Sequence, residues 1–403
     1  MTNENGKRKN NLELSGLKVA LIHDYLVEYG GAERVLECFA SIFPDAPVYT
    51  LLYDKKLAKK ILPGRIIRAS FLQNIPFARS FHRFFPLFMP MAVENLDLSY
   101  YDLVLSDSAS FAKGVITPAK AVHICYCHTP TRYVWDDCHK YVKEYSFPGF
   151  LRKIVPAGLN YVRLWDRLAA NRVDYYIANS KLVSERIKKY YQRNSIVINP
   201  PVFVKELLSP REQAKKRMSG KKTSSNLDQG YYLMLGRLMS YKKFDLGIKA
   251  FNRLKLPLKI IGGGPEINKL RKMAGPNVEI IGSLPPRDPR VAEYLAKSKA
   301  LIFPQEEDFG IVALEAMISG KPVIAYKAGG ALETVKENIT GLFFKRQTVK
   351  SLTKAIEKFE KLSKENCFNP FQIHEFALSF RREEFERKIK EFVLEKLNRT
   401  DLR

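Results

Sequence analysis

The chain has 403 residues, of which 46% are hydrophobic and 27% charged, and its formal net charge is +25. This composition is typical of a globular protein, and the length favours two domains. No apolar run approaches the roughly 18 residues that a membrane-spanning helix needs, and no apolar signal-peptide core follows the polar residues 1–11. We therefore expect a cytoplasmic protein that is not secreted, and the positive charge indicates an anionic partner.

The N-terminal half alternates short apolar runs with helical segments. Its first run, 17–23, is continuously apolar, which is typical of a parallel strand buried on both faces. Gly30 and Gly31 then open a predicted helix through Ala40. The other predicted elements of this half are strands at 47–51, 103–106, 121–126, 175–180 and 196–198 and a helix at 182–191.

Basic and aromatic residues interleave from Lys55 to Ala92. This segment holds eight Lys or Arg, six Phe and no acidic residue. Such a pattern suits the headgroup region of an anionic membrane. The alternatives are a core-packing region with a basic rim and a surface that stacks single-stranded nucleic acid. We expect the membrane surface and no nucleic-acid partner, because the chain has no recognisable nucleic-acid motif.

The five cysteines are odd in number and unevenly spread, which does not fit a disulfide framework. Cys125, Cys127 and Cys138 lie near His128 and His139, so a zinc site is conceivable, but the spacing matches no common zinc pattern. Because Cys125 lies in a predicted buried strand, we favour buried free thiols and expect no metal.

A second alternating series follows a polar stretch, 210–230, which is predicted to be a mobile linker or insertion. The residues after Pro370 are predicted to form long helices that pack on the domains. Two such series predict two doubly wound α/β domains that face across a ligand cleft at the carboxyl ends of their strands. The elements of the second series are strands at 231–235, 258–261, 278–281, 300–303 and 323–326 and helices at 243–254, 265–274 and 289–297.

The segment from Glu307 to Glu315 is the most informative of the chain. The first glutamate stands just before a predicted helix and the second, eight positions later, stands inside it. That separation is about 12 Å in a helix, so the two carboxyl groups do not share a proton but can bind two ends of one ligand. Gly310 lets the backbone approach a ligand closely, and amides at the helix start can hold phosphate. A solvated acidic helix start is the alternative for the pair taken alone.

Two cations follow the first strand of the second series. Arg237 and Lys242 lie in the turn at its carboxyl end, where they can neutralise a diphosphate. The guanidinium can donate two parallel hydrogen bonds to phosphate oxygens, and the ammonium acts as a point charge. The glycine-rich turn 262–264 indicates a tight backbone turn and matches neither a Walker P-loop nor G-x-G-x-x-G.

Together these motifs resemble glycosyltransferase family 4 from about Lys18 to Phe380. The most specific part is 307–335, which holds the E-x(7)-E element and the segments Ser319-Gly320-Lys321-Pro322 and Gly329-Gly330-Ala331-Leu332-Glu333-Thr334. The resemblance implies the GT-B fold of two Rossmann-like domains. It implies an acceptor-binding domain at 1–200, a nucleotide-sugar-binding domain at 201–370, and helices at 371–403 that return toward the first domain.

The resemblance also implies a role for each matching residue. Glu307 would contact hydroxyls of the donor sugar, and Glu315 would bind the ribose of the nucleotide. Arg237 and Lys242 would stabilise the leaving diphosphate, and His128 would lie near the sugar. Further donor contacts are implied for the backbone of Phe309, Gly310 and Ile311, for the loop at Gly30 and Gly31 that closes over the phosphates, and for Gly263.

Two segments, Tyr126–Asp136 and Ala328–Val335, are similar to a subset of the family, the bacterial O-antigen mannosyltransferases. We therefore expect transfer of a hexose, with retention, from GDP-mannose to a lipid-linked or polysaccharide acceptor in cell-surface glycan synthesis, at the inner face of the membrane. No Asp-x-Asp triplet occurs, so we expect metal-independent chemistry without a cofactor. A UDP-sugar donor, a nucleic-acid binder and a non-catalytic nucleotide-sugar binder are the alternatives.

Overall fold

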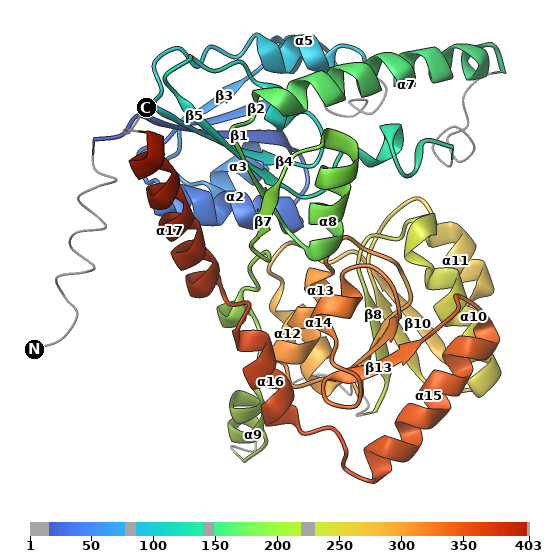
Figure 1. The fold of residues 1–403 in the computed structure, drawn as a ribbon. Helices are drawn as coiled ribbons and strands as arrows, with labels where there is room; N and C mark the ends of the chain where they lie inside the picture. The colour runs from blue at the N-terminus through green and yellow to red at the C-terminus, as the bar shows by residue number, and fades with distance from the viewer. Residues whose placement is uncertain (1–15, 77–85, 140–148, 219–229, 401–403) are drawn as a thin grey trace, which may run out of the picture. The chain divides into compact units, whose positions relative to one another are not determined.

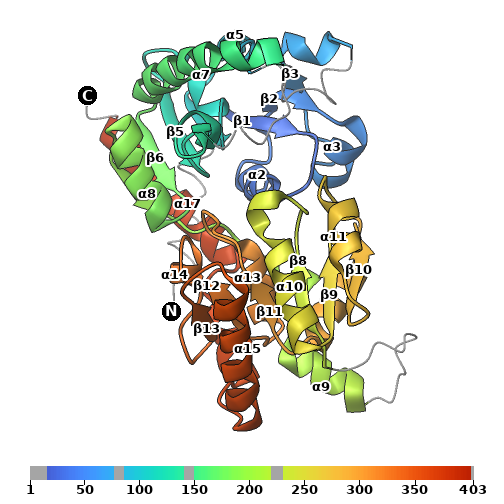
Figure 2. The same ribbon diagram turned by 90° about the vertical axis from the view of Figure 1, so that its right-hand side faces the viewer.

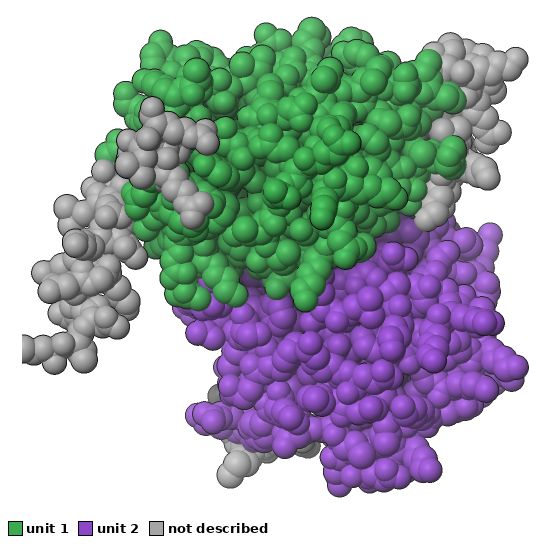
Figure 3. Space-filling view, viewed as in Figure 1, with its two compact units in different colours: residues 1–199, 385–403 green, residues 200–384 purple. Residues whose placement is uncertain are grey.

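The computed structural model describes residues 16–76, 86–139, 149–218 and 230–400. The chain forms two compact units, residues 1–199 with 385–403 (unit 1) and residues 200–384 (unit 2), as Figure 3 shows. Each unit is an α/β structure built on one parallel sheet, which confirms the predicted doubly wound class (Figures 1 and 2). Within the described residues, no helix has the length and apolar character needed to cross a membrane.

In its described residues, unit 1 has a seven-stranded parallel sheet in the order β3-β2-β1-β4-β5-β6-β7. The chain order reverses between β1 and β4, and doubly wound sheets bind ligands at the carboxyl ends of such a strand pair. Every residue of β4 and β5 is buried, as expected of parallel strands that are covered on both faces, and the polar residues Ser106 and Asp107 follow the apolar start of β4. The strands are β1 Val19–Leu26, β2 Val48–Tyr53, β3 Ile67–Ala69, β4 Leu103–Ser108, β5 Val122–Cys127, β6 Tyr175–Ala178 and β7 Ser195–Val197.

The last helix of the chain belongs to the core of unit 1. Phe385 of this helix, α17, stacks on Phe39 with ring centroids 6.1 Å apart and meets Tyr126 edge-on at 5.6 Å. The expected C-terminal segment 371–403 is therefore divided between the two units. The helices of unit 1 are α2 Gly31–Ile42, α3 Lys55–Ile61, α5 Met89–Glu94, α7 Gly149–Ala169, α8 Lys181–Arg186 and α17 Arg382–Thr400.

Two predicted elements need correction. The helix expected at 182–191 starts under an N-cap, where Ser180 accepts from Val183 N, but a π-helical turn replaces α-helix from Ile187 to Tyr191. The linker expected at 210–230 begins with a helix, α9 Pro210–Met218, and residues 219–229 lie outside the described residues.

Unit 2 has, in its described residues, a six-stranded parallel sheet in the order β10-β9-β8-β11-β12-β13, which reverses between β8 and β11. Alternate strand residues face two separate cores, as the period of a strand requires. Leu233 and Val323 face α12, α13 and α16, whereas Tyr232 and Ile324 face α10 and α15. The strands are β8 Tyr232–Leu235, β9 Leu258–Ile261, β10 Val278–Gly282, β11 Leu301–Phe303, β12 Val323–Tyr326 and β13 Gly341–Phe344. The helices after α9 are α10 Phe244–Leu254, α11 Ile267–Met273, α12 Pro289–Lys297, α13 Ile311–Ile318, α14 Ala331–Thr334, α15 Val349–Lys364 and α16 Pro370–Leu378.

Candidate functional site

In unit 2 the predicted site residues gather where β8 and β11 end, at the reversal of strand order. Lys242, in the turn after β8, places its Nζ 2.6 Å from Oε1 of Glu307, in the loop after β11. The buried amide of Gln305 donates to the same carboxylate oxygen at 3.3 Å. Both members of the ion pair keep some exposure, 12% for the lysine side chain and 17% for the glutamate. The arrangement holds a carboxylate and a cation together at the ligand-binding edge of the sheet.

Glu307 and Glu315 lie on two sides of a helix start. Helix α13 begins at Ile311 after Gly310, whose φ of 90° is in the left-handed region. Glu315 is buried inside α13, with 7% of its surface exposed, so it is not part of a solvated acidic helix start. The first amides of any α-helix have no partner within the helix, so those at Ile311 and beside it can serve an anionic ligand.

Glycines let the loops around this edge pack at backbone distance. A Cβ on Gly262 would lie 1.9 Å from the carbonyl oxygen of Gly236, and Leu238 N donates to Gly263 O at 2.8 Å. These contacts join the loops that follow β8 and β9. Gly263 and Lys242 therefore belong to the same connected loop layer. Arg237 lies exposed in that layer.

A second glycine pair, Gly329 and Gly330, packs against the loop that carries Glu307. Gly330 N donates to the carbonyl oxygen of Glu307 at 2.8 Å, and a Cβ on Gly330 would lie 2.2 Å from Cα of Phe309. Phe309 itself is buried, with its ring centroid 5.9 Å from that of Phe380. The sequence identifies this glycine pair only as part of a motif. In the structure the pair lets the backbone pack closely against the loop that carries Glu307.

In unit 1 the corresponding edge lies at the ends of β1 and β4, where His23 pairs with Asp107 in the strand register. His23 Nδ1 lies 2.8 Å from Asp107 Oδ2, and His128 Nε2 lies 2.5 Å from Asp107 Oδ1. Glu33 Oε1 lies 3.5 Å from His23 Nε2, and its Oε2 accepts from Gly30 N at 2.7 Å. A chain of contacts thus joins His128 to the loop at Gly30 and Gly31.

The electrostatics of this cluster follow from its burial. Burial alone would lower the pKa of His23, but the hydrogen bond to Asp107 and the contact with Glu33 outweigh it and raise the pKa to about 10. Burial would raise the pKa of Asp107, yet the two histidines hold that pKa below its usual value. Sequence reasoning found His128, Gly30 and Gly31 but missed His23 and Asp107. The available signal was the presence of polar residues at the carboxyl ends of two apolar strands.

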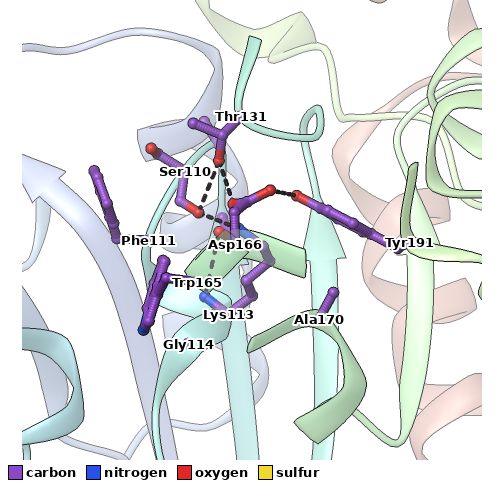
Figure 4. Close-up of polar contacts among 12 residues, drawn as sticks. Ser110, Phe111, Lys113, Gly114, Thr131, Trp165, Asp166, Ala170 and Tyr191 are labelled. Carbon is purple, nitrogen blue, oxygen red and sulfur yellow. Dashed lines mark hydrogen bonds and ion pairs between the residues drawn. The ribbon is translucent and has the colours of Figure 1, made fainter. Parts of the chain in front are cut away.

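The loop after β5 owes its shape to a buried carboxylate on α7 (Figure 4). Asp166 accepts from Thr131 Oγ1 at 2.7 Å, from Trp135 Nε1 at 2.8 Å and from Tyr191 OH at 2.9 Å. Nζ of the buried Lys113 lies 2.6 Å from the same carboxylate. The polar residues of the segment 126–136 therefore anchor the loop that starts at His128.

The cysteine cluster shows no metal geometry in the part of the chain that the structure describes. Cys125 and Cys127 are buried free thiols, as predicted. Burial raises the pKa of the Cys125 thiol to about 12, which removes its thiolate character at neutral pH.

Comparison with known proteins finds similarity to glycosyltransferases. The family model described as "Glycosyl transferases group 1" matches residues 216–367. The alpha-1,3/1,6-mannosyltransferase alg2 of Schizosaccharomyces pombe is 24% identical over 85% of this chain and 73% of its own length. A GDP-mannose-dependent alpha-(1-6)-phosphatidylinositol monomannoside mannosyltransferase of Mycolicibacterium smegmatis is 29% identical over 39% of this chain and 45% of its own length.

Solved structures show the same architecture. HepE of Anabaena, crystallised in complex with UDP, superposes with a TM-score of 0.67 at 19% identity and covers 94% of this chain and 99% of its own. The chain has the GT-B fold of two Rossmann-like units, as predicted. The family match and the relatives together support a glycosyltransferase of the group 1 type.

Proposed function

We propose that the protein is a retaining glycosyltransferase that transfers mannose from GDP-mannose to a lipid-linked or polysaccharide acceptor in cell-surface glycan synthesis. The observation that carries the reaction class is the Lys242–Glu307 pair at the β8/β11 edge of a unit that matches the group 1 family over residues 216–367. The mannosyltransferases among the relatives support the sugar.

Each residue of this edge binds a different part of the donor. Glu307 binds hydroxyls of the transferred sugar, and Glu315 binds the ribose hydroxyls. Lys242 and Arg237 neutralise the charge that develops on the diphosphate as the bond from the sugar C1 to its oxygen breaks. Phe309, Gly310 and Ile311 offer backbone amides. The acceptor oxygen bonds to C1 from the same face and its proton passes to the departing diphosphate, so the anomeric configuration is retained.

Two cations in the leaving-group site make a metal unnecessary in this mechanism. We expect the purified enzyme to turn over in the presence of EDTA at the rate measured without it. A rate that collapses with EDTA and returns with added divalent cation would contradict the metal-independent proposal.

Substitution tests the site assignment. Glu307→Gln and Lys242→Met should each lower kcat/KM by about 100-fold or more, because the first removes the carboxylate that binds the sugar hydroxyls and the second removes a charge placed where transition-state charge develops. Matched controls are Glu279→Gln and Lys249→Met, whose side chains are 57% and 55% exposed in surface ion pairs. Wild-type activity in either site variant, with an unchanged melting temperature, would reject the assignment.

The donor has one specific rival, a UDP-sugar, because HepE was crystallised with UDP. A nucleotide that binds only the folded state raises the melting temperature, so titration with GDP and UDP separates the two. We expect GDP to give the larger shift and a donor screen by product mass to return mannose. A larger shift with UDP, together with a different transferred sugar, would replace GDP-mannose as the donor.

An apolar face on unit 1 supports attachment to the cytoplasmic surface of a membrane. Helices α5 and α7 lie side by side in Figures 1 and 2, and a Cβ on Gly158 would lie 3.3 Å from Leu87. Six apolar side chains around these helices are 48% to 66% exposed, and three of them lie within the basic segment from Lys55 to Ala92. The six are Leu87, Phe88, Met91, Tyr161, Leu164 and Leu168.

Vesicle flotation tests this attachment. The protein should float with vesicles that contain anionic lipid at low salt, and the double variant Leu164→Asp/Leu168→Asp should not. Phe371→Asp is the control, because Phe371 is also an exposed apolar residue, at 51%, but lies on α16 of unit 2. Absence of flotation by the wild-type protein would remove the membrane from the proposal. The segment 77–85 of the basic stretch lies outside the described residues.

A further inference from the structure

We propose that Asp107 is a positioning residue for His128, holding the ring by Nε2 so that Nδ1 presents a lone pair to a hydroxyl of the bound carbohydrate. The proposal rests on the proposed glycosyl transfer and adds to it a residue that neither the family resemblance nor the comparisons assign. Its basis is the buried cluster at the β1/β4 edge of unit 1.

The carboxylate of Asp107 is shared between two histidines. An ionised carboxylate only accepts hydrogen bonds. Asp107 is 1% exposed, and its two oxygens each meet one imidazole nitrogen, Nδ1 of His23 and Nε2 of His128. Both nitrogens must therefore carry hydrogen. A neutral His128 ring that is protonated at Nε2 has an unprotonated Nδ1, which accepts a hydrogen bond.

The His128 side chain is 13% exposed, whereas Asp107 is enclosed. Among the described residues, His128 Nδ1 has no hydrogen-bond partner. The ring is held from behind, since Tyr126 packs edge-on against it with centroids 5.2 Å apart. The main chain of His128 is fixed as well, because Asn179 Nδ2 donates to its carbonyl oxygen at 2.9 Å.

His23 occupies the other oxygen of the Asp107 carboxylate. Its ring lies between Asp107 and Glu33, so one positive charge stands between two carboxylates. Asp24 follows His23 on β1, but its carboxylate is engaged by the main chain. It accepts hydrogen bonds from the four backbone amides of residues 109–112 at 2.5 to 2.8 Å. His23 thus keeps the second oxygen of Asp107 engaged, and through Glu33 it links His128 to the amide of Gly30.

The tautomer can be measured without any substrate. Full-length protein labelled with ¹⁵N-histidine contains six histidines, and long-range ¹H–¹⁵N spectra distinguish the two tautomers of each. His128→Gln identifies the relevant signals. At pH 8.5 we expect His128 to carry hydrogen on Nε2 alone. A ring protonated at Nδ1, alone or with Nε2, would overturn the proposal whether or not the enzyme is active.

Kinetics test the consequence. An Asn side chain accepts through Oδ1 and donates through Nδ2. Nδ1 of the protonated His23 needs the acceptor, so in Asp107→Asn the amide should face Nε2 of His128 and move the His128 hydrogen to Nδ1. We expect kcat to fall about 100-fold, as misplacement of a reacting contact does, with little change in the donor KM. The double variant Asp107→Asn/His128→Gln should be no slower than His128→Gln alone. Equal kcat in Asp107→Asn and wild type would overturn the proposal.

Ser106→Ala is the matched control, because Ser106 lies on the same strand and forms a buried 2.8 Å bond to His123, away from the carboxyl edge. It should keep the wild-type kcat. If Asp107→Asn fails to fold, the wild-type spectra decide. If the wild-type protein transfers sugar from no donor, the proposed function fails, and the spectra still accept or reject the geometry at His128.

Discussion

Gly310 shows how one backbone conformation sets the start of α13. Its φ is +90°, and a Cβ there would lie 2.8 Å from the buried ring of Phe303. Gly282 has nearly the same φ, +94°, with no atom within 4 Å of a built Cβ. Replacement of either glycine by alanine costs about 1–2 kcal/mol for the left-handed backbone, and only the first adds overlap, worth about 1–3 kcal/mol.

We therefore expect Gly310→Ala to lose more unfolding free energy than Gly282→Ala, by about 1–3 kcal/mol in urea unfolding. The excess measures the packing of the donor-site loop on β11. Equal losses in the two variants would show that Phe303 moves aside freely and that the loop is not fixed by this contact.

His23 gives the stability of unit 1 a dependence on alkaline pH. Its pKa is raised from 6.5 to about 10 in the folded protein. The folded state therefore holds a proton that the unfolded chain has lost, and this contribution is complete below pH 6.5 and vanishes as pH rises through about 10. Between those values the unfolding free energy should fall by about 1.4 kcal/mol per pH unit from this group.

The measurement is urea unfolding of wild type and His23→Gln at several pH values from 6.5 to 10. The difference between the two proteins should shrink steadily with rising pH. A difference that stays constant over this range would mean that His23 is neutral in the folded protein and that the charge assigned to the cluster is wrong.

At the scale of elements, α7 is tied to the segment between β4 and β5 by the buried Lys113–Asp166 pair. Nζ of Lys113 also lies 5.4 Å from the ring centroid of Tyr191, and it donates to the carbonyl oxygen of Ser110. Removal of one member leaves an uncompensated buried charge, which costs about 3–5 kcal/mol. Lys113→Met and Asp166→Asn should each show this loss.

Because each single variant leaves a charge behind, the double variant should lose less than the sum of the two by about 1–3 kcal/mol. The control cycle uses the exposed pair Lys249–Asp245, at 3.4 Å on one helix face, whose coupling should stay below about 0.5 kcal/mol. Additive losses at Lys113 and Asp166 would mean that the two side chains stabilise separate parts of unit 1.

The sequence predicts elements well where their signal is local. Long apolar runs such as β1 and β8 were found because both faces of a parallel strand are buried. β3, at Ile67–Ala69, was missed because it has three residues and partial burial. Helix α7 was missed because Pro156 interrupts its pattern.

Contacts between distant segments could not be predicted in the same way. The Lys242–Glu307 pair was predicted as a shared site by the family motifs, but its direct contact depends on β8 and β11 being neighbours. His23 and Asp107 are 84 positions apart and meet only through the register of β1 and β4. Neither residue belongs to a motif, so only the fold brings them to the site.

At the scale of the whole molecule, the chain crosses between its units twice, since unit 2 is continuous at 200–384 and unit 1 needs residues 385–403. Helix α17 gives five apolar side chains to the core of unit 1, each at most 7% exposed. Full burial of such a side chain contributes roughly 1.5–3 kcal/mol, so their sum is comparable to the total stability of a domain, about 5–15 kcal/mol. The five are Phe385, Ile389, Phe392, Val393 and Leu394.

A chain that ends at Glu384 should therefore lose the cooperative unfolding of unit 1 and keep that of unit 2. Calorimetry should show one remaining transition, and the nucleotide that stabilises the full protein should still raise it, because Lys242, Glu307 and Glu315 all lie in unit 2. The control removes only residues 398–403 and should retain both transitions. Loss of all cooperative unfolding in the chain that ends at Glu384 would mean that unit 2 depends on unit 1 for its fold. Two intact transitions would mean that α17 contributes little to the core in which its side chains lie.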